Sequence, residues 1–194
     1  LTADFDAVVL ACGATQSRDL PIPGRELDGI HFAMDFLRPN TRSLLDSSLA
    51  DGKFISARDQ HVIVIGGGST AIDIAVQSKK LGAEDVTLVY RRGPENMSAT
   101  NVEQEFAQVH DVKIRTWLQP NSWLVENGQL SGIRFEYTEL NSSGKLKGKD
   151  EFLELETDSA FLALGQKMTP KIFDLELEMN SEKLAVDENG ATSQ

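Results

Sequence analysis

Cysteine is almost absent from this sequence of 194 residues, which contains one, Cys12. A single thiol cannot form a disulfide framework, a CxxC redox pair or the ligand set of an iron–sulfur cluster. Cys12 lies in the apolar run DAVVLACGA, and we expect it to be a small buried side chain, because free cysteine is among the most buried residue types. Low cysteine usage also favours a cytoplasmic location.

Long apolar runs and an excess of positive charge are missing too. No segment reaches the roughly 18 apolar residues of a membrane-spanning helix, and no basic-then-apolar leader opens the chain. Acidic residues outnumber Lys and Arg by 30 to 19, so the formal net charge is −11. This balance argues against a general nucleic-acid-binding protein, because a phosphate backbone requires a basic surface. We expect neither a membrane nor a nucleic acid as a partner, although a local basic pocket for one small anion is compatible with this balance.

The first sixty residues are predicted to be mainly connecting structure. The stretch from Asp6 to Cys12 predicts a short buried strand, and RDLPIPGRELDGIHF contains the prolines and glycines of a turning connection. HFAMDFLR predicts two helical turns that end at Pro39, because proline in a helix removes a hydrogen bond. The polar stretch from Asn40 to Gln60 then predicts a surface excursion or linker.

A compact strand–turn–helix–strand unit is predicted between Val62 and Tyr90. HVIVIGGG is a β-branched strand that ends in three glycines, and STAIDIAVQSKKLGA has apolar residues with helical spacing. Gly82 stands where a left-handed residue would end that helix. DVTLVY supplies a second strand, so the segment has a βαβ arrangement.

The second half predicts more strands than helices. Thr100 and Glu103 have capping-box spacing at the start of a helix in SATNVEQEFAQVH, and VKIRTWL predicts a third strand. Two strands flank the hairpin signal Asn127-Gly128, and FLELETDSAFLALG supplies one or two more. The predicted fold class is therefore α/β and Rossmann-like: a βαβαβ parallel sheet followed by an antiparallel β-meander and one returning strand.

The three glycines match the dinucleotide-binding fingerprint G-x-G-x-x-[G/A], and they lie between a strand and a helix, as that motif requires. The first residue permits a tight turn, the third lets a pyrophosphate approach the backbone, and a small sixth residue lets the helix pack on the sheet. Free N–H groups at the helix start then bind the negative ligand. The predicted cofactor-binding residues of this turn are Gly66, Gly67, Gly68, Ser69, Thr70 and Ala71.

Two other interpretations of this turn stay open. It can be a structural tight turn in some other α/β protein, and methyltransferases that bind adenosyl cofactors also use a glycine-rich first turn. Those methyltransferases generally require an acid at the end of the second strand, where it binds the ribose hydroxyls. This chain has Arg91 and Arg92 there instead, which disfavours the methyltransferase interpretation.

The arginine pair stands where an acid would bind the ribose hydroxyls of NAD and an arginine would accommodate the 2′-phosphate of NADP. Arg91 follows Gly66 by 25 residues (91 − 66), close to the usual spacing of about 20. A guanidinium binds a phosphate through paired, charge-assisted hydrogen bonds. We predict NADPH as the cofactor and prefer Arg91 over Arg92, since side chains alternate along a strand and only one of the pair need face the ligand. The alternative is that both are a solvated strand end.

No catalytic residue and no metal site is predicted. His31, His61 and His110 are scattered without the spacing of metal ligands. Glu103 is assigned to helix capping and Glu105 to the surface, because residues two apart do not share a helix face. The sequence contains no discernible Ser/His/Asp or Cys/His arrangement.

These motifs resemble one group of flavoproteins. DAVVLACGATQSRDLPIPGRELDGIHFAMDFL is similar to the crossing region of the flavin- and NADPH-binding module in the glutamate synthase small subunit. VTLVYRR and AFLALGQ are typical of the wider group, which includes the flavin half of dihydropyrimidine dehydrogenase, and the resemblance covers most of residues 5 to 170. Family members commonly have Asp in place of Ser69 and MPA in place of Met97-Ser98-Ala99.

The resemblance implies a dinucleotide domain inserted into an FAD domain, in a parent enzyme that delivers hydride from NADPH to FAD and onward to iron–sulfur clusters. Residues 1–30 would be the crossing segment from the FAD domain, 31–60 a helical turn and linker, 61–165 the NADPH-binding domain and 166–194 the return segment. Gly165, in AFLALGQ, joins the cofactor-binding residues on the same ground. The implied partners are the FAD domain of the same chain and a large catalytic subunit.

The resemblance also places the FAD fingerprint before Leu1 and the strand that closes the flavin site after Gln194. The chain is therefore expected to be an excised domain that is inactive alone. Three functions stay open: the NADPH-binding module of a glutamate synthase-like enzyme, the same domain of a dihydropyrimidine dehydrogenase-type subunit, and a non-catalytic nucleotide-binding module.

Overall fold

The computed structural model describes residues 4–11, 13–168, 177–180 and 183–192. The chain divides into two compact units, one made of Leu1–Arg18 with Gln166–Gln194 and one made of Asp19–Gly165. None of the described helices combines the length and the apolar character needed to cross a membrane. The first unit contains two antiparallel pairs of short strands, β1 (Gln16–Ser17) with β10 (Gln166–Lys167) and β11 (Met179–Asn180) with β12 (Lys183–Leu184).

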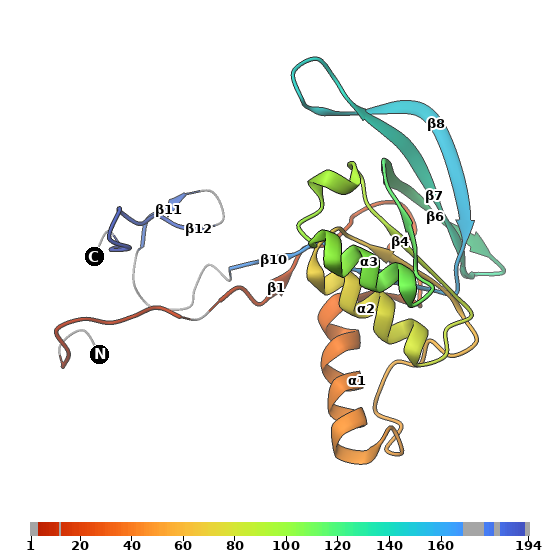
Figure 1. Ribbon diagram of the computed structural model, residues 1–194, viewed down its shortest axis with the longest axis horizontal. Helices are drawn as coiled ribbons and strands as arrows, with labels where there is room; N and C mark the ends of the chain where they lie inside the picture. Colours follow the sequence, from red (N-terminus) through yellow and green to blue (C-terminus); the bar gives the residue numbers. More distant parts are fainter. Residues whose placement is uncertain (1–3, 12, 169–176, 181–182, 193–194) are drawn as a thin grey trace. The chain divides into compact units, whose positions relative to one another are not determined.

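The second unit is built on a five-stranded parallel sheet (Figure 1). The strand order is β2-β9-β3-β4-β5, and every neighbouring pair is parallel. In chain order the strands are β2 (Ile30–Phe32), β3 (His61–Ile65), β4 (Asp85–Val89), β5 (Lys113–Arg115) and β9 (Ser159–Leu162). The predicted βαβαβ order is confirmed, and the returning strand lies between β2 and β3.

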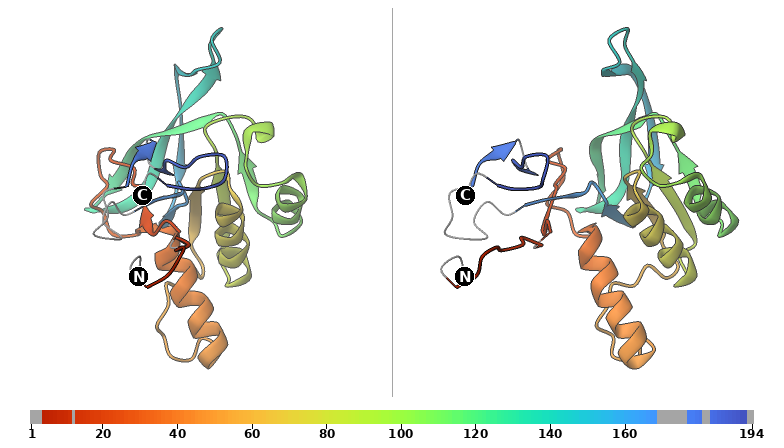
Figure 2. Two further views of the ribbon diagram at one scale, coloured as in Figure 1. Left: turned by 90° about the vertical axis from the view of Figure 1, so that its left-hand side faces the viewer. Right: turned by 60° about the vertical axis from the view of Figure 1, so that its left-hand side comes forward.

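Layers of structure cover both faces of this sheet, which explains why the central strands β3, β4 and β9 are buried along most of their length. One face packs against the helices α1 (Ala33–Ser47), α2 (Ser69–Lys80) and α3 (Asn101–Val109). The other face packs against an antiparallel meander of β6 (Leu118–Glu126), β7 (Gln129–Leu140) and β8 (Leu146–Glu156). Figure 2 shows the helices and the meander on opposite sides of the sheet. In β3, Val62 and Val64 belong to the helix-side core, whereas Ile63 and Ile65 belong to the meander-side core.

The predicted end of α2 is confirmed. Gly82 has φ +101°, in the left-handed region that favours glycine. The N–H of Ala83 donates to the carbonyl of Ser78 at 3.0 Å, and the N–H of Gly82 donates to that of Lys79 at 3.1 Å. These two bonds form a Schellman motif, which satisfies carbonyls that would otherwise lack a donor at the helix end.

Two further local predictions are confirmed. Thr100 and Glu103 form a reciprocal capping box at the start of α3, just after the short 3-10 turn η1 (Pro94–Asn96). Asn127 and Gly128, with φ of +52° and +80°, form the two-residue turn between β6 and β7. Positive φ at both positions is what a type I′ hairpin turn requires.

Helix α1 is longer than predicted, and the expected stop at Pro39 is wrong. The helix continues through Pro39 to Ser47, although proline withholds the N–H that would bond to the carbonyl of Asp35. Burial beyond Pro39 offsets this loss. Asn40 is fully buried, and its amide exchanges hydrogen bonds of 2.9 Å and 3.1 Å with the backbone of Ile55. The stretch predicted as a linker therefore begins with the last turns of α1, in which Asn40 and Ser43 are buried.

The predicted buried strand from Asp6 to Cys12 is not observed. Residues 6–11 pair with no described strand, and Val9 is 88% exposed. An apolar run becomes a strand only where a neighbouring strand satisfies its backbone groups, and no described strand does so here. Cys12 itself lies outside the described residues. The division of the chain after residues 30, 60 and 165 stays a prediction.

Candidate nucleotide-binding site

The carboxyl ends of β9, β3 and β4 meet at one edge of the sheet, because these three neighbouring strands are parallel. The glycine turn follows β3, the arginine pair follows β4, and Gly165, with φ +87°, follows β9. Gly165 and the arginines thus come from the two strands that flank β3. In open α/β sheets, ligands bind at this edge.

Gly66 is held by the strands on either side of β3. The N–H of Gly66 donates to the carbonyl of Val89 on β4 at 3.0 Å. On the other side, the N–H of Ala163, just beyond β9, donates to the carbonyl of Ile65, the residue before Gly66, at 2.9 Å. Gly66 has φ +154°, and a Cβ added there would overlap the carbonyl oxygen of Ala163. Glycine is therefore required by this close approach of two backbones.

The segment that precedes α3 is tied to the same turn. The carbonyl of Gly67 accepts the N–H of Ala99 at 3.0 Å and the hydroxyl of Ser98 at 3.4 Å. A Cβ added at Gly67 would lie 2.5 Å from the ring of Tyr90, whose hydroxyl donates to the carbonyl of Asn96 at 2.9 Å. The Tyr90 ring therefore occupies the space beside Gly67 and links the turn to this segment.

The first turn of α2 is open to solvent. Ser69 and Thr70 are exposed, whereas Ala71 is fully buried in the helix-side core, as its small size predicts. The carbonyl of Gly68 accepts the N–H groups of Ala71 at 2.9 Å and Ile72 at 3.3 Å. No described group accepts from the backbone N–H of Ser69 or Thr70. These donors, together with the helix dipole, can bind a phosphate.

Glu103 lies beside this helix start. Hydrogen bonds from the backbone of Thr100, from the hydroxyl of Ser69 and from the hydroxyl of Thr100 lower the pKa of Glu103 below its usual value. The bond to the Thr100 backbone N–H is 2.6 Å long. The predicted capping role is confirmed, but the sequence analysis missed the approach to Ser69. No sequence signal marks it, because the two residues lie on different helices.

Arg91 and Arg92 lie beyond the end of β4, and both are exposed. Neither guanidinium forms an ion pair or hydrogen bond with another described residue. Their backbone, by contrast, is held: the hydroxyl of Thr138 donates to the carbonyl of Arg91 at 2.7 Å, and the N–H of Trp117 donates to that of Arg92 at 3.1 Å. Two unpaired guanidinium groups on a fixed backbone are available for an anion, even in a chain with 30 acidic residues.

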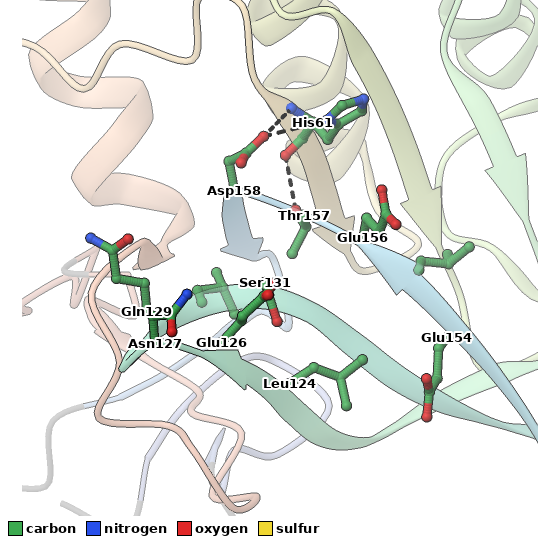
Figure 3. A pocket seen from close by; sticks show the side chains of 12 residues that line it. His61, Leu124, Glu126, Asn127, Gln129, Ser131, Glu154, Glu156, Thr157 and Asp158 are labelled. Carbon is green, nitrogen blue, oxygen red and sulfur yellow. Dashed lines mark hydrogen bonds and ion pairs between the residues drawn. The ribbon is translucent and has the colours of Figure 1, made fainter.

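A hollow of about 620 Å³ lies at the opposite, amino edge of the sheet (Figure 3). His61, the first residue of β3, donates its N–H to Asp158 at 2.8 Å, and its carbonyl accepts the Thr157 hydroxyl at 2.9 Å. Four carboxylates line the hollow and would repel the phosphates of a dinucleotide: Glu126, Glu154, Glu156 and Asp158. Among the described residues, no group of three or more His, Cys, Asp or Glu is placed to hold a metal. The hollow does not suit the predicted cofactor.

The relationship to known proteins is settled by a family model that covers the whole chain. The model describes the pyridine nucleotide-disulphide oxidoreductases, and it matches residues 1–194. The chain belongs to this family. Because these residues include one cysteine, they cannot themselves form the disulfide that the family name mentions.

Glutamate synthases are among the relatives of this oxidoreductase-family chain. The glutamate synthase [NADPH] small chain of Escherichia coli is 36% identical over 142 residues, which is 72% of this chain and 30% of that one. The small chain of Mycobacterium tuberculosis is 36% identical over 183 residues, which is 85% of this chain and 36% of that one. The glutamate synthase [NADH] of Schizosaccharomyces pombe is 60% identical over 82 residues, which is 42% of this chain and 4% of that protein. The chain therefore spans about a third of the small chains that it matches.

Solved structures of oxidoreductases share the fold. FprA of Mycobacterium tuberculosis superposes with a TM-score of 0.70 at 20% identity, over 94% of this chain and 54% of FprA. Thioredoxin reductase of T. acidophilum superposes with a TM-score of 0.66 at 15% identity, over 94% of this chain and 52% of the reductase. Identities this low establish the fold alone. The predicted α/β, Rossmann-like fold class is confirmed.

Proposed function

We propose that this family member is the NADPH-binding domain of a flavin-dependent oxidoreductase of the glutamate synthase small-subunit type. When bound, NADPH supplies a hydride for the FAD of the parent protein, from which electrons pass to iron–sulfur clusters. The FAD and the clusters are proposed to lie outside these residues, since one cysteine cannot ligate a cluster. A cytoplasmic location, an FAD domain in the same chain and a large catalytic subunit as a partner belong to this proposal.

The observation that carries the proposal is the meeting of a glycine turn and two unpaired arginines at one edge of the sheet. Gly66 permits the tight turn, and the absence of a side chain at Gly68 lets a pyrophosphate approach the backbone. The unused N–H groups of Ser69 and Thr70 then donate to its oxygens. The residues of the turn therefore fit the central part of a dinucleotide.

The arginine pair fits the end of NADPH that distinguishes it from NADH. Arg91 and Arg92 follow β4, the strand next to the glycine turn, and neither has another anionic partner among the described residues. A guanidinium can bind the 2′-phosphate through two parallel hydrogen bonds, which is why arginine suits this position better than lysine. The part of these residues in the reaction is to bind and orient the nucleotide.

NADH is the second candidate, for one specific reason. The relative from S. pombe, 60% identical over 82 residues, is named for NADH, whereas those from E. coli and M. tuberculosis, at 36% identity, are named for NADPH. We prefer NADPH because NADH offers no 2′-phosphate to an arginine pair.

The proposal is tested by isothermal titration calorimetry of the protein with NADPH and with NADH. We expect NADPH to bind at least about tenfold more tightly, which corresponds to about 1.4 kcal/mol. The double variant Arg91→Ala/Arg92→Ala should abolish this preference, with most of the loss on the NADPH side. A matched control is Arg38→Ala/Arg42→Ala, which removes two exposed arginines from α1 and should leave the ratio unchanged.

Equal affinity of the unmutated protein for the two cofactors would contradict the proposed NADPH preference and support NADH as the second candidate. An equal loss of NADPH affinity in the control variant Arg38→Ala/Arg42→Ala would mean that net charge alone, rather than a phosphate site, determines the affinity.

A dihydropyrimidine dehydrogenase-type subunit and a non-catalytic nucleotide-binding module remain the alternatives to the proposed parent. Anaerobic addition of NADPH to the full-length parent should bleach its flavin absorbance, and reduction of a pyrimidine by that protein would favour the dehydrogenase. Binding of NADPH to a parent without flavin would favour the non-catalytic module.

A further inference from the structure

The carbonyls of both arginines are bound by residues from the meander side of the sheet. Thr138, on β7, donates its hydroxyl to the carbonyl of Arg91 at 2.7 Å across 47 residues of sequence. Trp117, between β5 and β6, donates its N–H to the carbonyl of Arg92 at 3.1 Å. The exposed arginine segment is therefore held by its backbone, while its side chains stay available.

Trp117 and Thr138 are themselves joined. The N–H of Thr138 donates to the carbonyl of Trp117 at 2.9 Å, so the peptide groups of Arg91, Arg92, Trp117 and Thr138 form one connected set. Trp117 has φ +60°, a left-handed conformation that a bulky residue rarely adopts. Such conformations persist where the surrounding bonds hold them, and they are common at functional sites.

The position of Thr138 on β7 also departs from regular pairing. The register between β7 and β8 shifts between Glu136 and Thr138, as in a β-bulge, and bulges redirect side chains. Thr138 is 4% exposed, and a buried hydroxyl without a partner is costly. The Arg91 carbonyl accepts the hydrogen bond of this hydroxyl.

We propose that Thr138 is a positioning residue for the recognition of the 2′-phosphate, and that the meander thereby contributes to the choice of NADPH over NADH. This inference rests on the proposed function, since it acts through Arg91. A long arginine side chain binds more tightly when its backbone is fixed beforehand, because less freedom is lost on binding. Thr138 fixes that backbone without touching the ligand.

The test is the substitution Thr138→Val, which keeps the shape of the side chain and removes the donor. We expect NADPH affinity to fall about fivefold, the equivalent of one ordinary hydrogen bond, and NADH affinity to change by less than about twofold. Thr138→Ser, which keeps the hydroxyl, should restore the preference. Should Thr138→Val fail to fold, Thr138→Cys, with a much weaker donor, replaces it in the comparison.

Thr157→Val is the matched control. Thr157 is 2% exposed, and its hydroxyl lies within hydrogen-bonding distance of the carbonyls of Ser159, at 2.7 Å, and His61, at 2.9 Å, at the amino edge of the sheet. The Thr157→Val variant, like Thr138→Val, loses one buried hydroxyl, and we expect its ratio of NADPH to NADH affinity to stay unchanged. A merely structural role of Thr138 would make the two variants behave alike.

A double-mutant comparison separates this inference from the proposed function. In the Arg91→Ala/Arg92→Ala background, Thr138→Val should no longer lower NADPH affinity. If the arginine variant changes the cofactor preference but Thr138→Val, folded, weakens both cofactors equally or neither, the positioning role of Thr138 is refuted and the phosphate site stands. If the arginine variant leaves the preference intact, the phosphate site itself is refuted.

Discussion

The substitution Gly66→Ala tests whether the turn is set by a contact between two backbones. A Cβ at Gly66 would overlap the carbonyl oxygen of Ala163, and the φ of +154° is unfavourable for alanine. Both groups belong to main chain that is held by hydrogen bonds, to Val89 on one side and to Ile65 on the other. A side-chain rotation therefore cannot relieve the overlap, and neighbouring strands would have to move apart.

The expected loss of stability is about 2–6 kcal/mol, the sum of two costs. Overpacking of a filled site costs about 1–3 kcal/mol, and a non-glycine residue in a sparsely populated backbone region costs about 1–3 kcal/mol more. This total is a large part of the 5–15 kcal/mol that typically stabilises a domain. Urea unfolding, monitored by circular dichroism, measures this loss: the midpoint urea concentration should fall, while the slope of the unfolding free energy against urea concentration stays unchanged.

Gly128→Ala is the reference that isolates the backbone overlap. Gly128 has φ +80°, but a Cβ there would meet no atom within 4 Å, so we expect a loss of only about 1–2 kcal/mol from the left-handed conformation. If Gly66→Ala destabilises the protein no more than Gly128→Ala, the close approach of Gly66 and Ala163 does not constrain the turn. In that case the glycine would be explained by ligand access alone.

Two further predictions concern α1 and α3. Asn40→Leu should lower the free energy of unfolding by about 2–3 kcal/mol, because it leaves the buried backbone groups of Ile55 unpaired. The control Arg42→Ala, at an exposed site, should change this free energy by less than about 0.5 kcal/mol in the same urea assay. The pKa of Glu103 is lowered in the folded state, so its contribution to stability is present above the usual value of 4.5 and is lost as pH falls through the lower folded value. Glu103→Gln should therefore be less stable than the unmutated protein at pH 7 but not at pH 2 to 3; an equal difference at both pH values would contradict this origin.

The parts of the fold that the sequence predicts correctly depend on short-range chemistry. The Schellman end at Gly82, the capping box of Thr100 with Glu103 and the turn at Asn127-Gly128 each involve residues within a few positions of one another. The order of strand, glycine turn and helix is of this kind too, because both elements adjoin the turn directly, whereas the close approach of Gly66 to Ala163 is not.

The features that the sequence does not predict depend on residues distant in the chain. The continuation of α1 through Pro39 is stabilised by the bonds of Asn40 to Ile55, 15 residues away. Trp117 and Thr138 reach the arginine segment only because the meander folds onto the sheet, and the composition of β7 gives no sign of it. Propensity describes a local preference, and tertiary contacts override it at these positions.

The distribution of charge explains how a chain with a net charge of −11 can offer a site for an anionic dinucleotide. The carboxylates of the hollow lie at the amino edge of the sheet, near His61, whereas the glycine turn begins after Ile65. The four steps of β3 between these residues span about 13 Å, at about 3.3 Å a residue. This separation exceeds the screening length of about 8 Å at physiological salt. The repulsion from those acids is therefore largely screened at the turn. The charged groups at this edge include the carboxylate of Glu103, beside Ser69, and the unpaired guanidinium groups of Arg91 and Arg92, which follow the adjacent strand.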